Sequence, residues 1–354
     1  MLIIFRSLPL SADSRTIRNM EIYSKLDPNV EAFTWEGKTG NKNTFKLQKT
    51  GGKLSRAIKF ILFVLWVPYT IIRKRKSISS ICFMDLETAI LGVPVAKLLK
   101  IISIFDIVDP FSQTKGSNLR AFDILEIKIA KLADRICVPD ASRIQYYSDR
   151  QVGTLPNRVS VVENVPNFQT DRNRISILRN SYLSNRDEKK IRIGYFGTLD
   201  GNSRGLEYLV QEAEINSRLE LIIGGGGELN EFFQKYSGPA NLNFIGRFNH
   251  EELTRFLTSV DFNWAYYSPD IELHRYAAPN KFYEHLYFKL PIIVSAVIPQ
   301  SKFIENNNTG LVLSDLQPGA LFESCAKYLN HAKWEQDLWK AHYANYWDDI
   351  RAAI

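Results

Sequence analysis

Glycine, arginine and lysine gather where short apolar segments in the second half of the chain end. The first such loop spans residues 197–205 and contains Gly197, Thr198, Arg204 and Gly205. Glycine lets backbone come close to a ligand, a helix start offers free N–H groups, and arginine presents a planar fork suited to phosphate. The combination is typical of a phosphate-binding loop. A tight turn beside a solvated arginine is the structural alternative for this loop alone.

Two further loops follow the same plan. Residues 224–227 are an uninterrupted glycine run, and residues 276–284 contain Tyr276, Pro279, Asn280, Lys281 and Glu284. Pro279 suits the first turn of a helix, which would place the lysine near the helix start. Taken singly, Lys281 could be a solvated charge and Glu284 an ordinary polar helix residue. The order and spacing of the three loops together carry more weight.

These loops need a scaffold, and the pattern around them predicts one. Six short apolar runs lie between residues 191 and 313, and most of the segments between them have helical spacing. Asn249 and Glu252, for example, form a capping box ahead of an apolar stripe. Strands alternating with helices predict a parallel sheet, whose ligands bind at the carboxyl ends of the strands. The three loops stand at such ends.

In order and spacing, residues 190–315 resemble the donor half of GT-B glycosyltransferases, specifically the large retaining family that includes sucrose synthases and many bacterial polysaccharide enzymes. The resemblance implies that Gly197 and Arg204 hold the donor diphosphate and Glu284 the ribose hydroxyls. The family often has a second glutamate where this chain has Tyr276, so Asn280 and Lys281 become the expected pyrophosphate and sugar contacts. The expected donor-binding residues are Gly197, Thr198, Arg204, Gly205, Tyr276, Pro279, Asn280, Lys281 and Glu284.

The first half of the chain also places charges beyond strand-sized runs. Asp106 and Asp109 follow one run, and Asp13, Arg15 and Arg18 follow Leu2-Ile-Ile-Phe5. Helix caps, turns and surface charges explain these residues as well as function does. Related enzymes have similar patterns where the acceptor enters, so the resemblance implies an acceptor-side role for all five. Asp106 joins Arg204 and Lys281 as a catalytic candidate.

A basic stretch lies in this first half. Residues 37–84 include eleven Lys or Arg and no Asp or Glu. Within it, the apolar run 60–72 falls short of the roughly 20 residues that span a bilayer and is interrupted by Pro68. It could be a core helix, but its basic flanks favour an interfacial segment on an anionic membrane. The expected membrane-facing residues are Lys59, Trp66, Tyr69, Arg73, Lys74, Arg75 and Lys76.

Composition bounds these expectations. With 354 residues, 45% hydrophobic and 23% charged, the chain suits two domains with full cores and is not disordered. Leu2-Ile-Ile-Phe5 is too short for a signal peptide core. Three distant cysteines predict free thiols in a reducing compartment, and the histidines show no metal-ligand spacing. No nucleic-acid recognition motif accompanies the net charge of +7.

We therefore predict an α/β protein of GT-B architecture, with two doubly wound, Rossmann-like domains facing a cleft. Residues 1–175 would bind the acceptor and 176–330 the donor, with a linker at 171–190 and a helix in 331–354 that crosses back. The expected reaction moves a sugar from a UDP-sugar, or next a GDP-sugar, to a lipid-linked saccharide of a bacterial surface polysaccharide. It needs no metal or cofactor and is expected to retain configuration. The expected location is cytoplasmic, on the inner face of the cytoplasmic membrane.

Three other classes compete with this prediction. A nucleotide-sugar epimerase can share the GT-B fold and would turn over its substrate without an acceptor. A non-catalytic membrane-bound protein would explain the basic stretch but not the loops from Gly197 to Glu284. A nicotinamide dehydrogenase is disfavoured, because the first strand is not followed by Gly-x-Gly-x-x-Gly.

Overall fold

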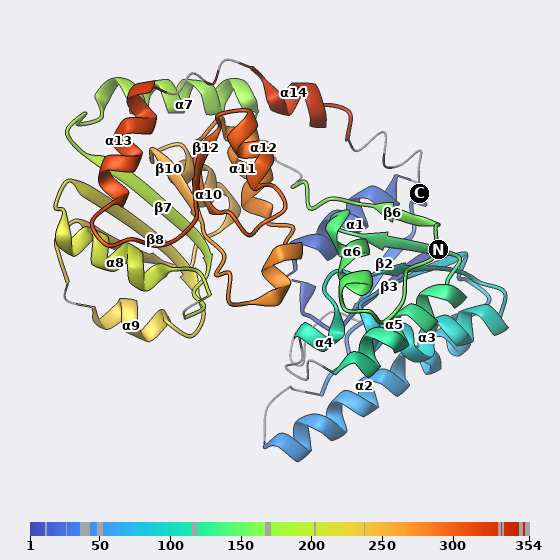
Figure 1. Ribbon diagram of the computed structural model, residues 1–354. Helices are drawn as coiled ribbons and strands as arrows, with labels where there is room; N and C mark the ends of the chain where they lie inside the picture. The colour runs from blue at the N-terminus through green and yellow to red at the C-terminus, as the bar shows by residue number, and fades with distance from the viewer. Residues whose placement is uncertain are drawn as a thin grey trace. The chain divides into compact units, whose positions relative to one another are not determined.

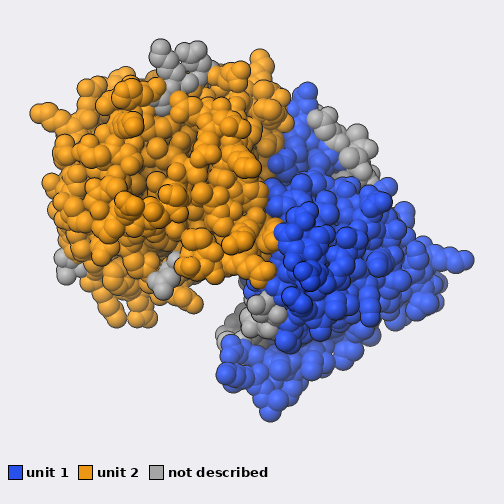
Figure 2. Space-filling view, in the orientation of Figure 1, with its two compact units in different colours: residues 1–164, 345–354 blue, residues 165–344 orange. Residues whose placement is uncertain are grey.

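The computed structural model describes residues 1–10, 13–25, 27–35, 43–47, 52–114, 119–166, 171–201, 203–236, 238–331, 334, 336–346 and 350. The chain divides into unit 1, Met1–Asn164 with Asn345–Ile354, and unit 2, Val165–Ala344 (Figure 2). Each unit contains a parallel sheet that has six strands among the described residues, flanked by helices (Figure 1). The predicted α/β class, with two doubly wound domains, is confirmed.

The sheet of unit 1 has the strand order β2-β1-β3-β4-β5-β6. Its strands are β1 (Leu2–Arg6), β2 (Val30–Thr34), β3 (Ser80–Met84), β4 (Ile102–Asp106), β5 (Arg135–Val138) and β6 (Val159–Val161). Its helices include α1 (Ser14–Ser24), α2 (Lys53–Lys74), α3 (Leu86–Leu98), α4 (Phe111–Thr114), α5 (Arg120–Leu132) and α6 (Ser142–Asp149). The order reverses at β1, which pairs with both β2 and β3.

The sheet of unit 2 has the order β12-β11-β10-β7-β8-β9. Its strands are β7 (Ile191–Thr198), β8 (Leu219–Gly226), β9 (Leu242–Gly246), β10 (Phe262–Ala265), β11 (Ile292–Ser295) and β12 (Gly310–Leu313). Its helices include α7 (Arg172–Asn185), α8 (Leu206–Ile215), α9 (Asn230–Lys235), α10 (His250–Leu257), η2 (Glu272–Tyr276), α11 (Asn280–Phe288), α12 (Ser301–Asn306), α13 (Leu321–His331) and α14 (Leu338–Tyr343). Here the order reverses at β7, beside β10.

Helices cover both faces of the unit 2 sheet. One core cluster joins the strands to α8 and α13 through Leu209 and Phe322, and another joins them to α7, α10 and α11 through Ile175, Leu257 and Phe288. Burial on both faces explains why these strands appear in the sequence as continuous apolar runs rather than alternating ones.

The linker predicted at 171–190 is wrong, because most of it forms α7 and packs on unit 2. Ile175 is 2% exposed, and Arg179 donates a hydrogen bond to the Val260 carbonyl. The units divide between residues 164 and 165 rather than between 175 and 176. The polar composition hid this helix, because a few apolar positions suffice to dock a helix that is otherwise solvated. Beyond α14, Asn345–Ile354 are part of unit 1.

Helix α2 also departs from the prediction. It continues through Pro68 for 22 residues, and among the described helices it is the one long and apolar enough, by length and composition only, to cross a membrane. One face packs inward, with Phe63, Val67 and Ile71 fully buried. Trp66, expected on the membrane side, instead contacts the rings of Phe5, Phe33, Phe45 and Phe63. The prediction of an outward-facing Trp66 is wrong.

Candidate functional site

In an open parallel sheet, ligands bind at the carboxyl ends of the strands where the strand order reverses. In unit 2 this place, between β7 and β10, holds a cavity of about 220 Å³. The end of β7, the residues after β10 and the start of α11 supply its walls. The lining residues are Tyr195, Phe196, Gly197, Thr198, Arg204, Ala265, Tyr266, Tyr267, Asn280, Lys281 and Glu284.

Glycines shape this cavity in two ways. A Cβ on Gly197 would lie 2.7 Å from the Lys281 Nζ, so glycine leaves room for that ammonium group. Gly205 is the N-cap of α8 and has a φ of +63°, a conformation that residues with a Cβ seldom adopt. The glycine run has a packing role instead. A Cβ on Gly225 would lie 1.7 Å from the Gly197 carbonyl oxygen, so β8 approaches β7 closely only without a side chain there.

Arg204 enters the cavity with hydrogen-bonding capacity to spare. Its guanidinium lies 4.2 Å from the centre of the Tyr267 ring, and its Nε is 3.8 Å from the Asp200 carboxylate. Its Nη1 is buried and has no hydrogen-bond partner among the described residues. The Arg204 carbonyl accepts a 2.7 Å hydrogen bond from the Trp264 indole, which fixes the backbone. A preorganised arginine with an unpaired donor is suited to bind an anion.

Lys281 and Glu284 lie three residues apart near the start of α11, and their charges interact. The Lys281 ammonium donates to the Phe196 carbonyl and lies 4.6 Å above the Tyr195 ring. Burial lowers the pKa of Lys281 to about 8, while Glu284 opposes that shift and Arg204 adds to it. Burial raises the pKa of Glu284, and Lys281 opposes the rise. The Glu284 Oε2 has no hydrogen-bond partner among the described residues.

The cavity therefore presents two cations and one carboxylate whose hydrogen bonds are incompletely used. Cations and an unpaired N–H can bind phosphate oxygens, while a carboxylate oxygen can accept hydrogen bonds from hydroxyl groups. A ligand that carries both anionic oxygens and hydroxyls matches this set. No cluster of His, Cys, Asp or Glu in the described part of the chain could hold a metal ion.

The predicted donor-side residues are largely brought together. Six of them line the cavity, namely Gly197, Thr198, Arg204, Asn280, Lys281 and Glu284. Gly205 is the N-cap of α8, Tyr276 is the buried last residue of η2, and Pro279 precedes α11. Sequence analysis missed Tyr195, Phe196, Ala265, Tyr266 and Tyr267. The tyrosine pair directly after β10 could have been found from its strand-end position alone.

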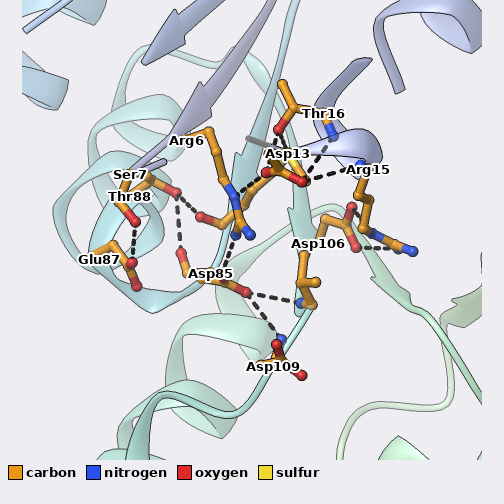
Figure 3. Close-up of polar contacts among 12 residues, drawn as sticks. Arg6, Ser7, Asp13, Arg15, Thr16, Asp85, Glu87, Thr88, Asp106 and Asp109 are labelled. Atoms are coloured by element: carbon orange, nitrogen blue, oxygen red, sulfur yellow. Dashed lines mark hydrogen bonds and ion pairs between the residues drawn. The ribbon is translucent and has the colours of Figure 1, made fainter. Parts of the chain in front are cut away.

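The corresponding strand ends of unit 1 hold a network of buried ion pairs (Figure 3). Arg6, at the end of β1, donates to Asp13 over 2.5 Å and also to Asp85, which follows β3. Asp13 in turn accepts from the backbone N–H groups of Arg15 and Thr16 and so caps α1. Asp85 has a φ of +63°, and burial raises its pKa to about 7 against the opposing effect of Arg6.

Asp106 is buried, and its carboxylate is engaged by neighbouring side chains. Its side chain is 2% exposed and is held by Arg15 through two hydrogen bonds, of 2.6 and 2.9 Å. Asn19 donates a third, of 2.9 Å. Arg18 donates to Asn164 at 2.8 Å. The described contacts of this carboxylate are all with other residues of unit 1, which gives it a structural role, and its catalytic role stays a prediction. Its partner Arg15 lies 91 residues away and was not recognisable as such in the sequence.

Asp109 differs from these neighbours. Its side chain is 40% exposed, and its Oδ1 accepts a 2.6 Å hydrogen bond from Arg143, a residue that the sequence did not single out. Cys82, Cys137 and Cys325 are free and buried, as expected for unpaired thiols.

Residues 190–331 match the model of the family described as glycosyl transferases group 1. The whole chain is similar in structure to WaaG, a glycosyltransferase involved in lipopolysaccharide biosynthesis, with 16% identity, a TM-score of 0.66, and 100% of this chain and 98% of that chain covered. It is also similar to sucrose-phosphate synthase of Thermosynechococcus elongatus, with 16% identity, a TM-score of 0.65, and 99% and 94% covered.

Anabaena HepE, solved in complex with UDP-glucose, is a third similar structure, with 12% identity, a TM-score of 0.64, and 99% and 94% covered. At these identities the solved structures establish the shared fold. No curated protein sequence matches this chain. The family resemblance inferred from the loops of residues 190–315 is confirmed. The chain has the GT-B fold of these structures, and its residues 190–331 form a domain of the group 1 glycosyl transferase family.

Proposed function

We propose that this enzyme moves a sugar from a nucleotide sugar, UDP-linked first and GDP-linked next, to a lipid-linked saccharide. The observation that carries the donor half is the cavity between β7 and β10. There Arg204 and Lys281 stand beside Glu284, with an unpaired arginine N–H and an unpaired carboxylate oxygen. Two cations suit a diphosphate, and the carboxylate suits ribose hydroxyls. A UDP-glucose complex of HepE, a protein of the same fold, supports this assignment.

The reaction follows from the charge that develops on the leaving nucleoside diphosphate. Preorganised donors that meet this charge lower the barrier, and Arg204, Lys281 and the backbone N–H groups at the starts of α8 and α11 provide them. These groups can replace a divalent ion. With retention of configuration, a donor phosphate oxygen accepts the acceptor proton, so the enzyme needs no strong protein base. Asp106 is therefore not required for proton transfer.

Titration calorimetry of the full chain with UDP, GDP and NAD tests the donor assignment. We expect UDP to bind most tightly, GDP less tightly and NAD not measurably, with no change when EDTA is added. Failure of both UDP and GDP to bind would contradict the proposal.

The UDP-GlcNAc 2-epimerase of Methanocaldococcus jannaschii, with a TM-score of 0.52, keeps an epimerase as the second candidate. Conversion of a UDP-sugar to its epimer without an acceptor would identify that activity.

The membrane half of the proposal rests on the outer face of α2. Large apolar side chains recur there every three or four residues, each between 49% and 76% exposed: Leu54, Ile58, Ile61, Leu65, Tyr69 and Ile72. Arg73, Arg75 and Lys76 follow this stripe and are also exposed. Lys74 pairs with Glu31 at 3.1 Å. An apolar helix face with basic residues at its end is complementary to an anionic leaflet.

Since the opposite face of α2 packs into unit 1, the helix cannot be surrounded by lipid. We propose that it lies in the plane of the membrane surface. There it would hold the enzyme on the cytoplasmic side, where a lipid-linked acceptor is confined and a soluble nucleotide sugar can reach it. The involvement of WaaG, a protein of the same fold, in lipopolysaccharide biosynthesis is consistent with such an acceptor.

Sedimentation with vesicles of phosphatidylglycerol and phosphatidylcholine tests this surface. Binding should weaken at high salt and in a variant with Gln at residues 73–76, because screening and charge removal act on the same attraction. Replacing Ile61 and Leu65 by Ser should weaken it as well. Ile177→Ser, at a 69% exposed position on α7, is the matched control. Wild-type protein that stays in the supernatant at low salt would refute the membrane role.

A further inference from the structure

The loops after β4 and β5 in unit 1 form a second polar group beside the ion network. These two strands are hydrogen-bonded neighbours, so their carboxyl ends lie next to each other. Asp109 comes from the first loop, while Ser142 and Arg143 open α6 after the second. The 2.6 Å hydrogen bond from the Arg143 Nη2 to the Asp109 Oδ1 ties the two loops together.

Asp109 stands apart from the other carboxylates at these strand ends. The side chains of Asp13, Asp85 and Asp106 are at most 12% exposed and are paired with Arg6 or Arg15. The Asp109 side chain is 40% exposed, and its Oδ2 accepts no hydrogen bond from any described residue. A carboxylate that is oriented by a buried arginine and open on one side is ready to accept a hydrogen bond from outside.

Arg143 has more donors than its contacts use. Its side chain is 5% exposed, yet Nε and Nη1 are buried without a partner among the described residues, and so is the neighbouring Ser142 hydroxyl. Such groups are rare in folded proteins, because an unpaired buried donor costs free energy, and they are often functional. An arginine with a purely structural role would be expected to donate hydrogen bonds from more of its guanidinium N–H groups.

We propose that Asp109, Arg143 and Ser142 form a saccharide-hydroxyl subsite, which rests on the proposed transferase function and would receive the acceptor sugar. Asp109 accepts a hydrogen bond from one sugar hydroxyl, while Arg143 orients the carboxylate and acts as a positioning residue. The Ser142 hydroxyl can donate to or accept from a neighbouring sugar hydroxyl.

The charges nearby favour a neutral polyol over a phosphate. The N-terminus of α6 is already occupied, since the Asp140 Oδ1 accepts a 2.8 Å hydrogen bond from the Ser142 N–H. The Asp109 carboxylate is the group that faces outward here, and it would repel an approaching anion. Sugar hydroxyls donate as well as accept, so they match carboxylates and arginine together.

Saturation-transfer NMR on the full chain tests the subsite, with free glucose, galactose and N-acetylglucosamine as probes, each with and without UDP. We expect wild-type protein to bind at least one of these sugars. Asp109→Asn should weaken that binding about tenfold or more, because it removes a hydrogen bond to a charged acceptor. Arg143→Lys should also weaken it, since a lysine cannot hold the carboxylate through a planar fork.

Three controls separate this effect from misfolding and from the donor site. Lys97→Gln disrupts an exposed ion pair with Asp134 in the same unit and should leave sugar binding unchanged. The melting temperature of Asp109→Asn should fall, because the charge of the buried Arg143 loses its partner, but the variant should stay folded at the temperature of the NMR experiment and keep the wild-type affinity for UDP. Sugar binding unchanged in Asp109→Asn, or no binding of any probe to wild type, would overturn the subsite. Failure of wild type to bind UDP or GDP would overturn the donor assignment instead.

Discussion

Both units reverse their strand order beside a central strand. The polar groups at that point are paired with one another in unit 1 and partly unpaired in unit 2. In unit 1 the reversal lies at β1 and β3, where Arg6 joins Asp13 and Asp85 in a closed set of buried ion pairs. In unit 2 it lies at β7 and β10, where Arg204 and Glu284 keep buried atoms unpaired beside a cavity. Position at a strand end is therefore insufficient to identify a ligand site. Unused hydrogen-bonding capacity next to an open volume is the better criterion.

We expect the largest effect from Asp106→Asn, which tests whether the buried ion pairs of unit 1 stabilise the fold. Removing one charge of a buried pair leaves Arg15 uncompensated, so the free energy of unfolding in urea should fall by about 3–5 kcal/mol. The affinity for UDP should not change. The control is a double variant, Arg15→Met with Asp106→Leu, which removes both charges. Its free energy of unfolding should fall by less than that of the single variant. Full stability with abolished transfer would restore the catalytic role that the sequence predicted for Asp106.

In unit 2, Arg204→Ala tests whether the unpaired groups beside the cavity serve catalysis. This variant should lose about 2–4 kcal/mol of transition-state stabilisation, measured as kcat/KM, because the donor that meets the leaving group is removed. Arg218→Ala is a closely matched control. Arg218 lies 4.1 Å from the Phe322 ring and 3.8 Å from the Glu323 carboxylate, but it is 53% exposed and lies outside the cavity. Equal kinetics in the two variants would remove Arg204 from the donor site.

Glu284→Gln should weaken UDP binding by about 1.5–2 kcal/mol, because a carboxylate that accepts ribose hydroxyls is lost. Its melting temperature should stay near that of wild type, since burial already raises the pKa of this carboxyl group. Calorimetry measures the UDP affinity, and thermal unfolding of the same preparation measures the melting temperature. A marked drop in melting temperature with unaltered UDP affinity would make Glu284 a structural residue, like Asp106.

The smallest effect concerns the pH dependence of Lys281. Its pKa of about 8 means that the ammonium loses its proton above that pH, so UDP affinity should fall by about 1 kcal/mol per pH unit. Lys281→Arg should abolish this pH dependence of UDP affinity. The stability of the folded protein should depend on pH in the opposite direction. The folded-state pKa lies below the unfolded value of about 10.4, so the unfolded chain binds more protons and stability rises with pH between the two values. Affinity and stability that fall together would indicate alkaline unfolding instead.

Much of unit 2 could be predicted because its signals are local. The capping box at Asn249 and Glu252 forms as expected, with hydrogen bonds of 2.9 and 2.8 Å. Continuous apolar runs followed by glycine, arginine or lysine placed the cavity residues at strand ends. The family resemblance added the expected role of Glu284, which spacing alone would not have supplied.

Unit 1 resisted prediction because its signals are long-range. Whether Asp106 is open or paired depends on Arg15, which only the folded sheet brings within 2.6 Å. Pro68 did not end α2, because packing of Phe63, Val67 and Ile71 can offset the hydrogen bond that proline removes. The partnership of Arg143 with Asp109 likewise links two loops that are adjacent only through the pairing of β4 and β5.

The return of Asn345–Ile354 to unit 1 has a consequence for how the protein is made. The Tyr346 hydroxyl accepts a 2.5 Å hydrogen bond from the Glu163 backbone, and Ile350 is 8% exposed. A ribosome releases residues 1–164 first, but that unit cannot close around these side chains until all of unit 2 has emerged. Domains usually mature from the amino terminus onward during translation. Here the domain that begins first is the one that finishes last, and nascent unit 1 stays incomplete throughout synthesis of its neighbour.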